Sequence, residues 1–248
     1  MDKYTIVIPT LWKSNRIGKL LFDLIKCEFV DEIILIDNAG KFFEHFEGLD
    51  KVKLVQVEEN IYVNPAWNLG IKIAKNDCIA ILNDDINFNP NIFEVINKDI
   101  LNQFGIIGMG EGNYKSLNIE GDPILEVWQP GVNDWGWGCF IMLDKKHWID
   151  IPDNIKIWYG DNFIKDVNPA PKACLRNFRV DTEMTSTSTK GWRRSAANTA
   201  RCCTSTRSST ASVAPAKCSR TSTTVSRPTS SPSPRASPAP TCRSRRRS

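Results

Sequence analysis

The sequence predicts an α/β fold in which a mostly parallel central sheet is flanked by helices. Apolar runs of strand length alternate with segments of helical periodicity over residues 3–103. The strand candidates are near-continuous apolar runs, which is typical of strands covered by helices on both faces. Polar residues follow these runs at once, and the carboxyl ends of parallel strands are where such sheets bind ligands.

The first half of this pattern contains three strands and one helix. KYTIVIPT (3–10) is the first strand candidate, and DEIILIDNAG (31–40) is the second. KVKLVQVEEN (51–60) alternates like a third strand. Between the first two, SNRIGKLLFDLIKC (14–27) has apolar residues at helical spacing, with Ser14 as the expected N-cap.

The second half predicts helix, strand and helix. NPAWNLGIKIAKN (64–76) and NPNIFEVINKDILNQ (89–103) both open with an Asn-Pro pair. Asn64 and Asn89 are therefore expected N-caps, with proline at the first helical position. DCIAILNDD (77–85) is the fourth strand candidate, and it runs directly into two carboxylates.

The composition divides the chain in two. Residues 1–166 carry 16 Lys and Arg against 26 Asp and Glu, whereas residues 167–248 carry 16 against 2. No isoleucine follows Ile164. We therefore predict a folded domain over 1–166 and a basic, low-complexity Ser/Thr/Arg/Pro-rich tail over 167–248 that is disordered.

The composition of the tail indicates a change of reading frame or a fused sequence. A basic disordered tail can bind nucleic acid through the phosphates. The abrupt switch from an Ile/Asn/Lys/Asp-rich to an Ala/Arg/Pro/Ser-rich composition favours a tail without a selected function, so we expect no nucleic-acid partner.

Several classes of protein are disfavoured. No apolar run approaches 18 residues, so no membrane span is expected, and the absence of signal-peptide features predicts a cytoplasmic protein. Eight cysteines without C-x-x-C spacing, and only two histidines, disfavour a zinc site. The chain has no G-x-G-x-x-G after its first strand and no P-loop motif, which disfavours dehydrogenases and P-loop NTPases.

The segment Asn83-Asp84-Asp85 has two interpretations. It is either a polar turn that caps the next helix or a site for a hard cation. Mg²⁺ and Mn²⁺ take oxygen ligands and need only one or two protein carboxylates when substrate phosphates complete the shell. The residue chemistry alone favours neither.

Four segments together resemble the family-2-type glycosyltransferases with the nucleotide-sugar-binding GT-A fold. They are TIVIPT, EIILIDNAG, ENIYVNPAWNLGIKIAKNDCIAILNDDI and WGWGCFIML, and the resemblance covers residues 3–165. It implies a Mn²⁺- or Mg²⁺-dependent, inverting transfer of a sugar from a nucleotide sugar to a hydroxyl group of a glycan acceptor. UDP is the favoured nucleotide.

The resemblance implies roles for several residues on the donor side. Pro9 and Thr10 match the end of the first strand, where the nucleoside lies, and Asp37 matches the acid that pairs with the base. Asn68 matches a nucleotide-binding segment in which Tyr62 replaces the usual glycine.

The metal-binding residues are implied by the family's D-x-D motif. Asn83 stands for its first Asp, Asp85 matches the direct metal ligand, and Asp84 is the second candidate, placed with the nucleotide-binding residues.

The acceptor side is implied by two later segments. Trp135 and Trp137 either form a platform for the acceptor or donor sugar or pack in the core. Asp161 matches the general base that takes the proton from the acceptor hydroxyl, and its alternative is a helix N-cap.

The chain departs from the family after this acid, since a late histidine and further elements are missing. Its Pro-Ala stretches resemble linkers of large-virus proteins, which suggests a viral enzyme in the host cytoplasm. Two alternatives remain: an inactive nucleotide-sugar-binding pseudoenzyme, and a sugar-phosphate nucleotidyltransferase.

Overall fold

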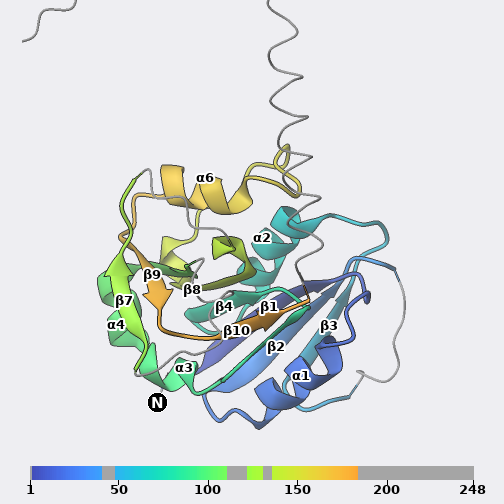
Figure 1. The fold of residues 1–248 in the computed structure, drawn as a ribbon. Coiled ribbons are helices and arrows are strands. Elements are labelled where there is room, and N and C mark those ends of the chain that lie inside the picture. The colour runs from blue at the N-terminus through green and yellow to red at the C-terminus, as the bar shows by residue number, and fades with distance from the viewer. Residues whose placement is uncertain (1, 41–47, 111–121, 131–135, 184–248) are drawn as a thin grey trace, which may run out of the picture. The chain divides into compact units, whose positions relative to one another are not determined.

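The computed structural model describes residues 2–40, 48–110, 122–130 and 136–183 (Figure 1). Its elements in chain order are β1 (Tyr4–Thr10), α1 (Ile17–Lys26), β2 (Val30–Asp37), β3 (Val52–Gln56), α2 (Val63–Ile73), β4 (Cys78–Leu82), β5 (Ile86–Phe88), α3 (Ile92–Val95), α4 (Lys98–Phe104), β6 (Ile106–Met109), β7 (Ile124–Val127), the 3₁₀ turn η2 (Trp137–Cys139), β8 (Phe140–Asp144), the 3₁₀ turn η3 (Lys145–His147), α6 (Gly160–Val167), β9 (Lys172–Arg176) and β10 (Val180–Thr182).

The central sheet confirms the predicted α/β class. Its strand order is β3-β2-β1-β4-β8-β6-β9-β7. The half from β3 to β4 is entirely parallel, and β6 pairs parallel with β9, while β8 and β7 run antiparallel to their neighbours. The chain leaves β1 toward β2 and later returns on the other side with β4, so the carboxyl ends of β1 and β4 form the switch point at which such sheets bind ligands.

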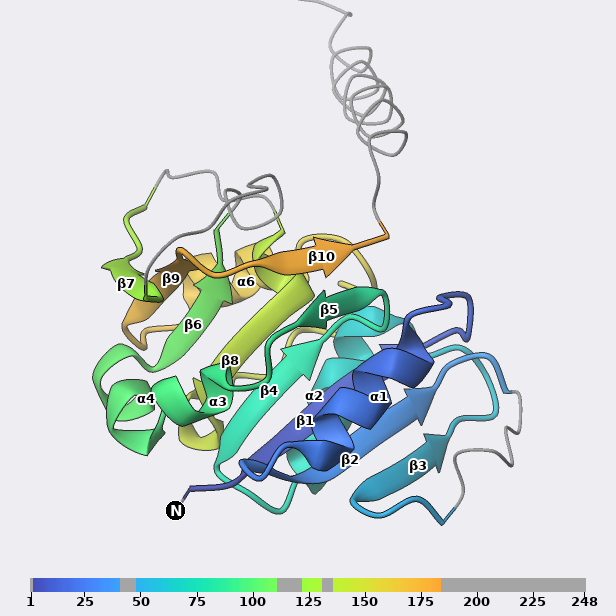
Figure 2. The ribbon, with the colours of Figure 1, turned by 60° about the horizontal axis from the view of Figure 1, so that its bottom comes forward.

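Helices cover both faces of the sheet, which explains why its central strands β1, β2, β4 and β8 are mostly apolar and buried. Residues of α1, α3 and α4 pack with one face, and residues of α2 and α6 pack with the other. Figures 1 and 2 show α1 and α2 on opposite sides of β1 and β2. The alternate residues of β1 divide accordingly: Ile6 and Ile8 belong to the α1 side and Val7 to the α2 side.

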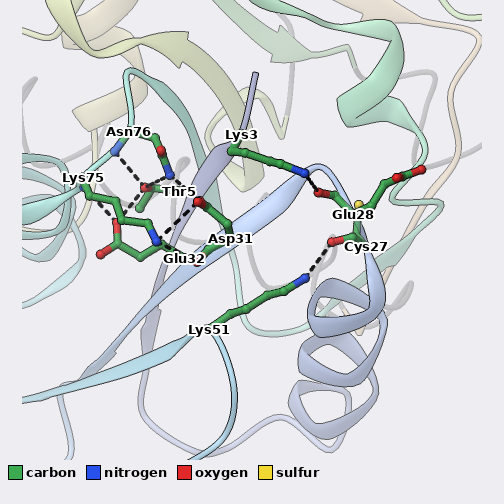
Figure 3. A network of polar contacts seen from close by, with 9 residues as sticks. All are labelled: Lys3, Thr5, Cys27, Glu28, Asp31, Glu32, Lys51, Lys75 and Asn76. Carbon is green, nitrogen blue, oxygen red and sulfur yellow. Dashed lines mark hydrogen bonds and ion pairs between the residues drawn. The ribbon is translucent and has the colours of Figure 1, made fainter. Parts of the chain in front are cut away.

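A polar network fixes the amino ends of β1, β2 and β4, opposite the switch point (Figure 3). The buried Glu32 accepts hydrogen bonds from the Thr5 hydroxyl (2.7 Å) and the Lys75 backbone N–H (2.8 Å). Asn76 donates to Thr5 Oγ1 (3.0 Å) and to Asp31 Oδ1 (2.6 Å). Since each buried polar group here has a partner, the network holds the strands in register without leaving a free site.

The folded part extends past the boundary predicted after residue 166. β9 pairs with β6 and β7 inside the central sheet, and β10 pairs antiparallel with β5 in a small second sheet (Figure 2). The tail begins later than predicted because Ala173, Cys174 and Leu175 are buried apolar residues of β9. Residues 184–248, on which the prediction of disorder also rests, lie outside the described residues.

Two predicted helix starts and one predicted helix were wrong. α1 begins at Ile17, and the Ser14 hydroxyl caps a turn by accepting from the Arg16 N–H (3.0 Å). α2 begins before Asn64, whose side chain binds elsewhere. The helix expected over 89–103 is divided into α3 and α4, because Asn97 starts a new helix by accepting from the Ile100 N–H (3.1 Å).

Two absences hold within the described residues. No helix there is long and apolar enough to cross a membrane. No group of three or more His, Cys, Asp or Glu side chains there is arranged to hold a metal ion. Of the four cysteines in this part, Cys78, Cys139 and Cys174 are buried and Cys27 is half-buried.

Candidate active site

Three strand ends bring polar side chains together at the carboxyl edge of the parallel half of the sheet. Pro9 and Thr10 end β1, Asp37 ends β2, and Asp84 lies two residues after β4. The Thr10 hydroxyl donates a hydrogen bond to Asp84 Oδ2 at 2.6 Å. Trp12 links the first two strands, since its backbone N–H donates to Thr10 Oγ1 (2.9 Å) and its indole N–H donates to Asp37 Oδ1 (2.8 Å).

Asp37 has one buried oxygen that still needs a donor. The residue is 0% exposed, and its Oδ1 accepts from Trp12 and from the Ala39 backbone N–H (2.9 Å). Its Oδ2 has no hydrogen-bond partner among the described residues. An unpaired buried acceptor costs about 1–3 kcal/mol, so this oxygen is suited to receive an N–H group from a ligand.

Asp84 and Asp85 concentrate negative charge after β4. Burial raises the pKa of Asp84 above its ordinary value, and the Thr10 hydrogen bond opposes this shift. The negative charges of Asp85 and Glu183 raise the pKa of Asp84 further. Asp85 Oδ2 accepts from the Thr182 hydroxyl (2.9 Å) of β10.

The oxygens of this pair fit a divalent cation. Asp85 Oδ1 is buried and has no donor among the described residues. A hard cation would satisfy that oxygen and offset the repulsion between the two carboxylates. With only two carboxylates available, the remaining ligands would come from water and from substrate phosphates, as is usual for Mg²⁺.

Asp161 lies in the first turn of α6, half-buried. The alternative interpretation of Asp161 as a helix N-cap is wrong, because Tyr159 occupies that position in a left-handed conformation. Asp161 Oδ1 accepts from the Asn162 backbone N–H at 3.0 Å. Its side chain packs against η2, where a Cβ added to Gly138 would lie 3.1 Å from Asp161 Cβ. The other carboxylate oxygen stays available to accept a proton.

The turn η2 connects Asp161 with the carboxylates after β4. Asn83, the residue before Asp84, donates its backbone N–H to the carbonyl oxygen of Cys139 in η2 at 3.0 Å. Gly138, which contacts Asp161, is the neighbouring residue of η2. The acid of α6 and the carboxylate pair therefore flank one short turn, although 76 residues separate Asp85 from Asp161 in the chain.

Two predicted site residues lie elsewhere. Trp137 is 0% exposed and packs face-on beneath Gly108, so its ring cannot serve as a sugar platform. Asn68 binds the segment before α6, since its amide donates to the Ile151 carbonyl (2.8 Å) and accepts from the Trp148 indole (3.2 Å). Its polar atoms are thus occupied by structural contacts rather than offered to a nucleotide. Trp135 lies outside the described residues.

Sequence reasoning missed four residues that shape the site. Trp12 bonds to Thr10 and Asp37 from a loop position with φ of 57°, and no motif marks it. Thr182 and Glu183 reach Asp84 and Asp85 because β10 pairs with β5, yet their segment reads as tail from composition. Asn64 was assigned only a capping role. Hydroxyl and acidic residues shortly after the last apolar run were the one available signal for Thr182 and Glu183.

Comparisons with known proteins agree with this architecture. Residues 5–110, less than half of the chain, match the family described as glycosyl transferase family 2. No curated protein matches the sequence. This match agrees with the predicted resemblance to the family-2-type glycosyltransferases over those residues. The viral origin stays a prediction.

The solved structure of S. aureus TarS 1–349 shares the fold. The structure of TarS 1–349 is 16% identical, with a TM-score of 0.55, and the match covers 73% of this chain and 60% of that one. The chain thus spans about three fifths of that structure. The TarS complex with UDP matches at 18% identity and a TM-score of 0.47 over 65% of this chain and 53% of that one. The TarS complex with UDP-GlcNAc matches at 20% identity and a TM-score of 0.38, over 49% of this chain and 37% of that one.

Proposed function

We propose that the chain is a metal-dependent glycosyltransferase that moves a sugar from a UDP-sugar to a hydroxyl group of a glycan acceptor with inversion at the anomeric carbon. The observation that carries this proposal is the carboxylate pair Asp84-Asp85 at the switch point of the sheet. Asp84 accepts a hydrogen bond from Thr10, and the turn η2 lies between the pair and Asp161. The match of residues 5–110 to glycosyl transferase family 2 supports the same reaction class.

The donor nucleotide would occupy the ends of β1 and β2. The unpaired Oδ2 of Asp37 can accept the N3–H of uracil, which removes the cost of leaving this buried oxygen without a donor. Pro9 and Thr10 border the same edge. TarS, which has the same fold, has been solved with UDP and with UDP-GlcNAc, so UDP is the first nucleotide to test.

The diphosphate would lie beside Asp84 and Asp85. Two carboxylates repel a diphosphate unless a cation lies between them, which is the reason for proposing Mn²⁺ or Mg²⁺. Asp85, with its unpaired Oδ1, would be the direct ligand, and Asp84 would complete the site through its second oxygen or through water. A cation bound there offsets the negative charge that develops on the departing diphosphate.

Asp161 would act as the general base. It accepts the proton of the acceptor hydroxyl as that oxygen attacks the anomeric carbon, and UDP leaves from the opposite face. A single displacement of this kind inverts the configuration. Asp161 suits the role because it is half-buried beside η2 and its carboxylate makes one hydrogen bond, to its own neighbour in the helix.

Release of UDP from a panel of UDP-sugars tests the proposal, with water as the acceptor. We expect the wild type to hydrolyse at least one UDP-sugar slowly in the presence of Mn²⁺. Asp161→Asn should lower that rate by about 10²–10⁴-fold and leave UDP binding intact. Asp99→Asn, an exposed acid on α4, is the matched control. UDP binding without any hydrolysis by the wild type would favour the inactive pseudoenzyme instead.

A further inference from the structure

Three consecutive large apolar side chains are exposed directly before α6. Ile157 is 45% exposed, Trp158 is 58% exposed and Tyr159 is 67% exposed. Tryptophan is strongly buried on average, so an exposed Trp-Tyr pair is informative. Exposed large apolar side chains at adjacent positions make this segment a candidate interaction site.

The backbone that carries these side chains is fixed at both ends by one buried residue. Asn64 of α2 is 0% exposed, and its backbone N–H donates to the Lys156 carbonyl (3.1 Å) while its side-chain amide donates to the Ile155 carbonyl (3.0 Å). At the other end, a Cβ added to Gly160 would lie 2.2 Å from Asn64 Oδ1. The aromatic residues are therefore held outward from an anchored loop.

Tyr159 adopts a conformation that L-residues rarely use. Its φ is 67° and its ψ is 6°, a left-handed conformation that is unfavourable for a residue with a Cβ. Glycine would avoid this cost, yet the chain has tyrosine here. Strain of this kind is found at functional sites, where the surrounding structure holds a side chain in a required place.

The loop over residues 155–160 borders both halves of the candidate active site. Asp161 follows Tyr159 by two residues. On the donor side, the Lys156 amine lies 4.9 Å from the ring centroid of Tyr62, and the Tyr62 carbonyl accepts from the Asn38 side chain (3.2 Å), next to Asp37. The exposed rings thus belong to the loop that leads directly into the proposed base and contacts the donor side.

We propose that Trp158 and Tyr159 form the acceptor platform, on which the apolar face of a pyranose ring of the glycan acceptor stacks. This inference rests on the proposed function and names the residues that hold its acceptor. The C–H groups of a sugar ring pack well on the electron-rich face of an aromatic ring. Because the backbone of the platform is anchored, the platform would hold the sugar ring of the acceptor in a fixed position. The acceptor hydroxyl could then reach Asp161 without the cost of ordering a loop first. It replaces the platform expected at Trp137.

Binding to a printed glycan array tests the platform. The full chain would be applied with UDP and Mn²⁺, as the wild type and as Trp158→Ala, Tyr159→Ala and Tyr159→Phe. Phe22→Ala is the matched control, because Phe22 is an exposed aromatic residue (56%) on α1, away from the loop. Binding of UDP by each variant would be measured by calorimetry in parallel.

We expect the wild type to retain a defined set of glycans and each alanine variant to bind them roughly ten-fold more weakly, as expected for one lost ring contact. Tyr159→Phe and Phe22→Ala should bind like the wild type, and all variants should bind UDP equally. Wild-type protein that binds UDP but no glycan would overturn the platform. If the wild type forms a dimer that Tyr159→Ala dissociates, the rings belong to an interface with a second copy of the chain, and this result would also overturn the platform. Glycan retention without UDP binding would refute the proposed donor site and leave the platform standing.

Discussion

The contact between Gly70 of α2 and Val7 of β1 gives the sharpest prediction about packing. A Cβ added to Gly70 would lie 2.2 Å from Val7 Cγ1 and 3.0 Å from Cγ2. Val7 is 0% exposed in a central strand, and a β-branched side chain has few alternative rotamers there. The glycine therefore determines how closely α2, which carries Asn64, packs on the sheet.

The magnitude for Gly70→Ala follows from two opposing effects. Alanine gains about 1 kcal/mol over glycine in a helix interior. Overpacking costs about 1–3 kcal/mol, and a 2.2 Å approach belongs at the upper end of that range. We therefore expect a net destabilisation of about 1–2 kcal/mol, together with weaker UDP binding if α2 is pushed outward.

The sign should reverse in a Val7→Ala background. Both γ carbons are then absent, and the remaining contact, with Val7 Cβ at 3.2 Å, is tolerable. Gly70→Ala should stabilise that background by about 1 kcal/mol through helix propensity and cavity filling. Urea unfolding of the four proteins measures this coupling. Equal destabilisation by Gly70→Ala in both backgrounds would refute the reasoning.

Three further predictions concern charge, strain and reactivity. Burial raises the pKa of Asp144, but hydrogen bonds from Lys98 and Lys146 outweigh this effect and lower the pKa below its ordinary value. The ionised carboxylate therefore stabilises the fold at any pH above that ordinary pKa, and this stabilisation is lost as the pH falls through the lowered pKa. Asp144→Asn should lower the free energy of unfolding by about 2 kcal/mol at pH 7, and the difference in unfolding free energy between variant and wild type should become smaller in acid. A difference that stays constant with pH would contradict this. Tyr62 has φ of 69° and ψ of −177°, so Tyr62→Gly should be more stable than Tyr62→Ala by about 1 kcal/mol in thermal melts, and the reverse order would remove the strain argument. Burial raises the pKa of the Cys78 thiol to about 11, so peptide mass spectrometry should find Cys78 unmodified after iodoacetamide treatment of the native protein at pH 8; rapid labelling would show that the core opens.

The parallel half of the sheet was predictable because its signals are local. Each of its strands is an apolar run that ends in polar residues, and the chain order alternates with amphipathic helices. The same logic located Thr10, Asp37 and Asp84, since residues at the ends of neighbouring parallel strands converge whatever the details of packing. The structure adds the hydrogen bonds that connect these residues. The bond from the Trp12 indole to Asp37 is the one that no sequence pattern predicts.

The parts that failed depend on contacts between distant segments. β10 pairs with β5 across more than 90 residues, and the Ser- and Thr-rich sequence after Asp181 does not identify Asp85 as the partner of Thr182. The burial of Trp137 of η2 depends on the absence of a side chain at Gly108 of β6. Asn64 has the residue type of an N-cap, but its amide is used by a loop 91 residues away. Such contacts between distant segments override local propensity.

The most direct test of the account is calorimetric titration of UDP with and without Mn²⁺. It would be performed on the wild type, on Asp85→Ala and on Asp99→Ala, which removes an exposed carboxylate from α4. We predict UDP binding that depends on Mn²⁺ in the wild type and in Asp99→Ala, and that Asp85→Ala abolishes. UDP binding that ignores Mn²⁺ and survives Asp85→Ala would contradict a cation site at this strand end. Folded wild-type protein that binds no UDP in either condition would contradict the donor site itself.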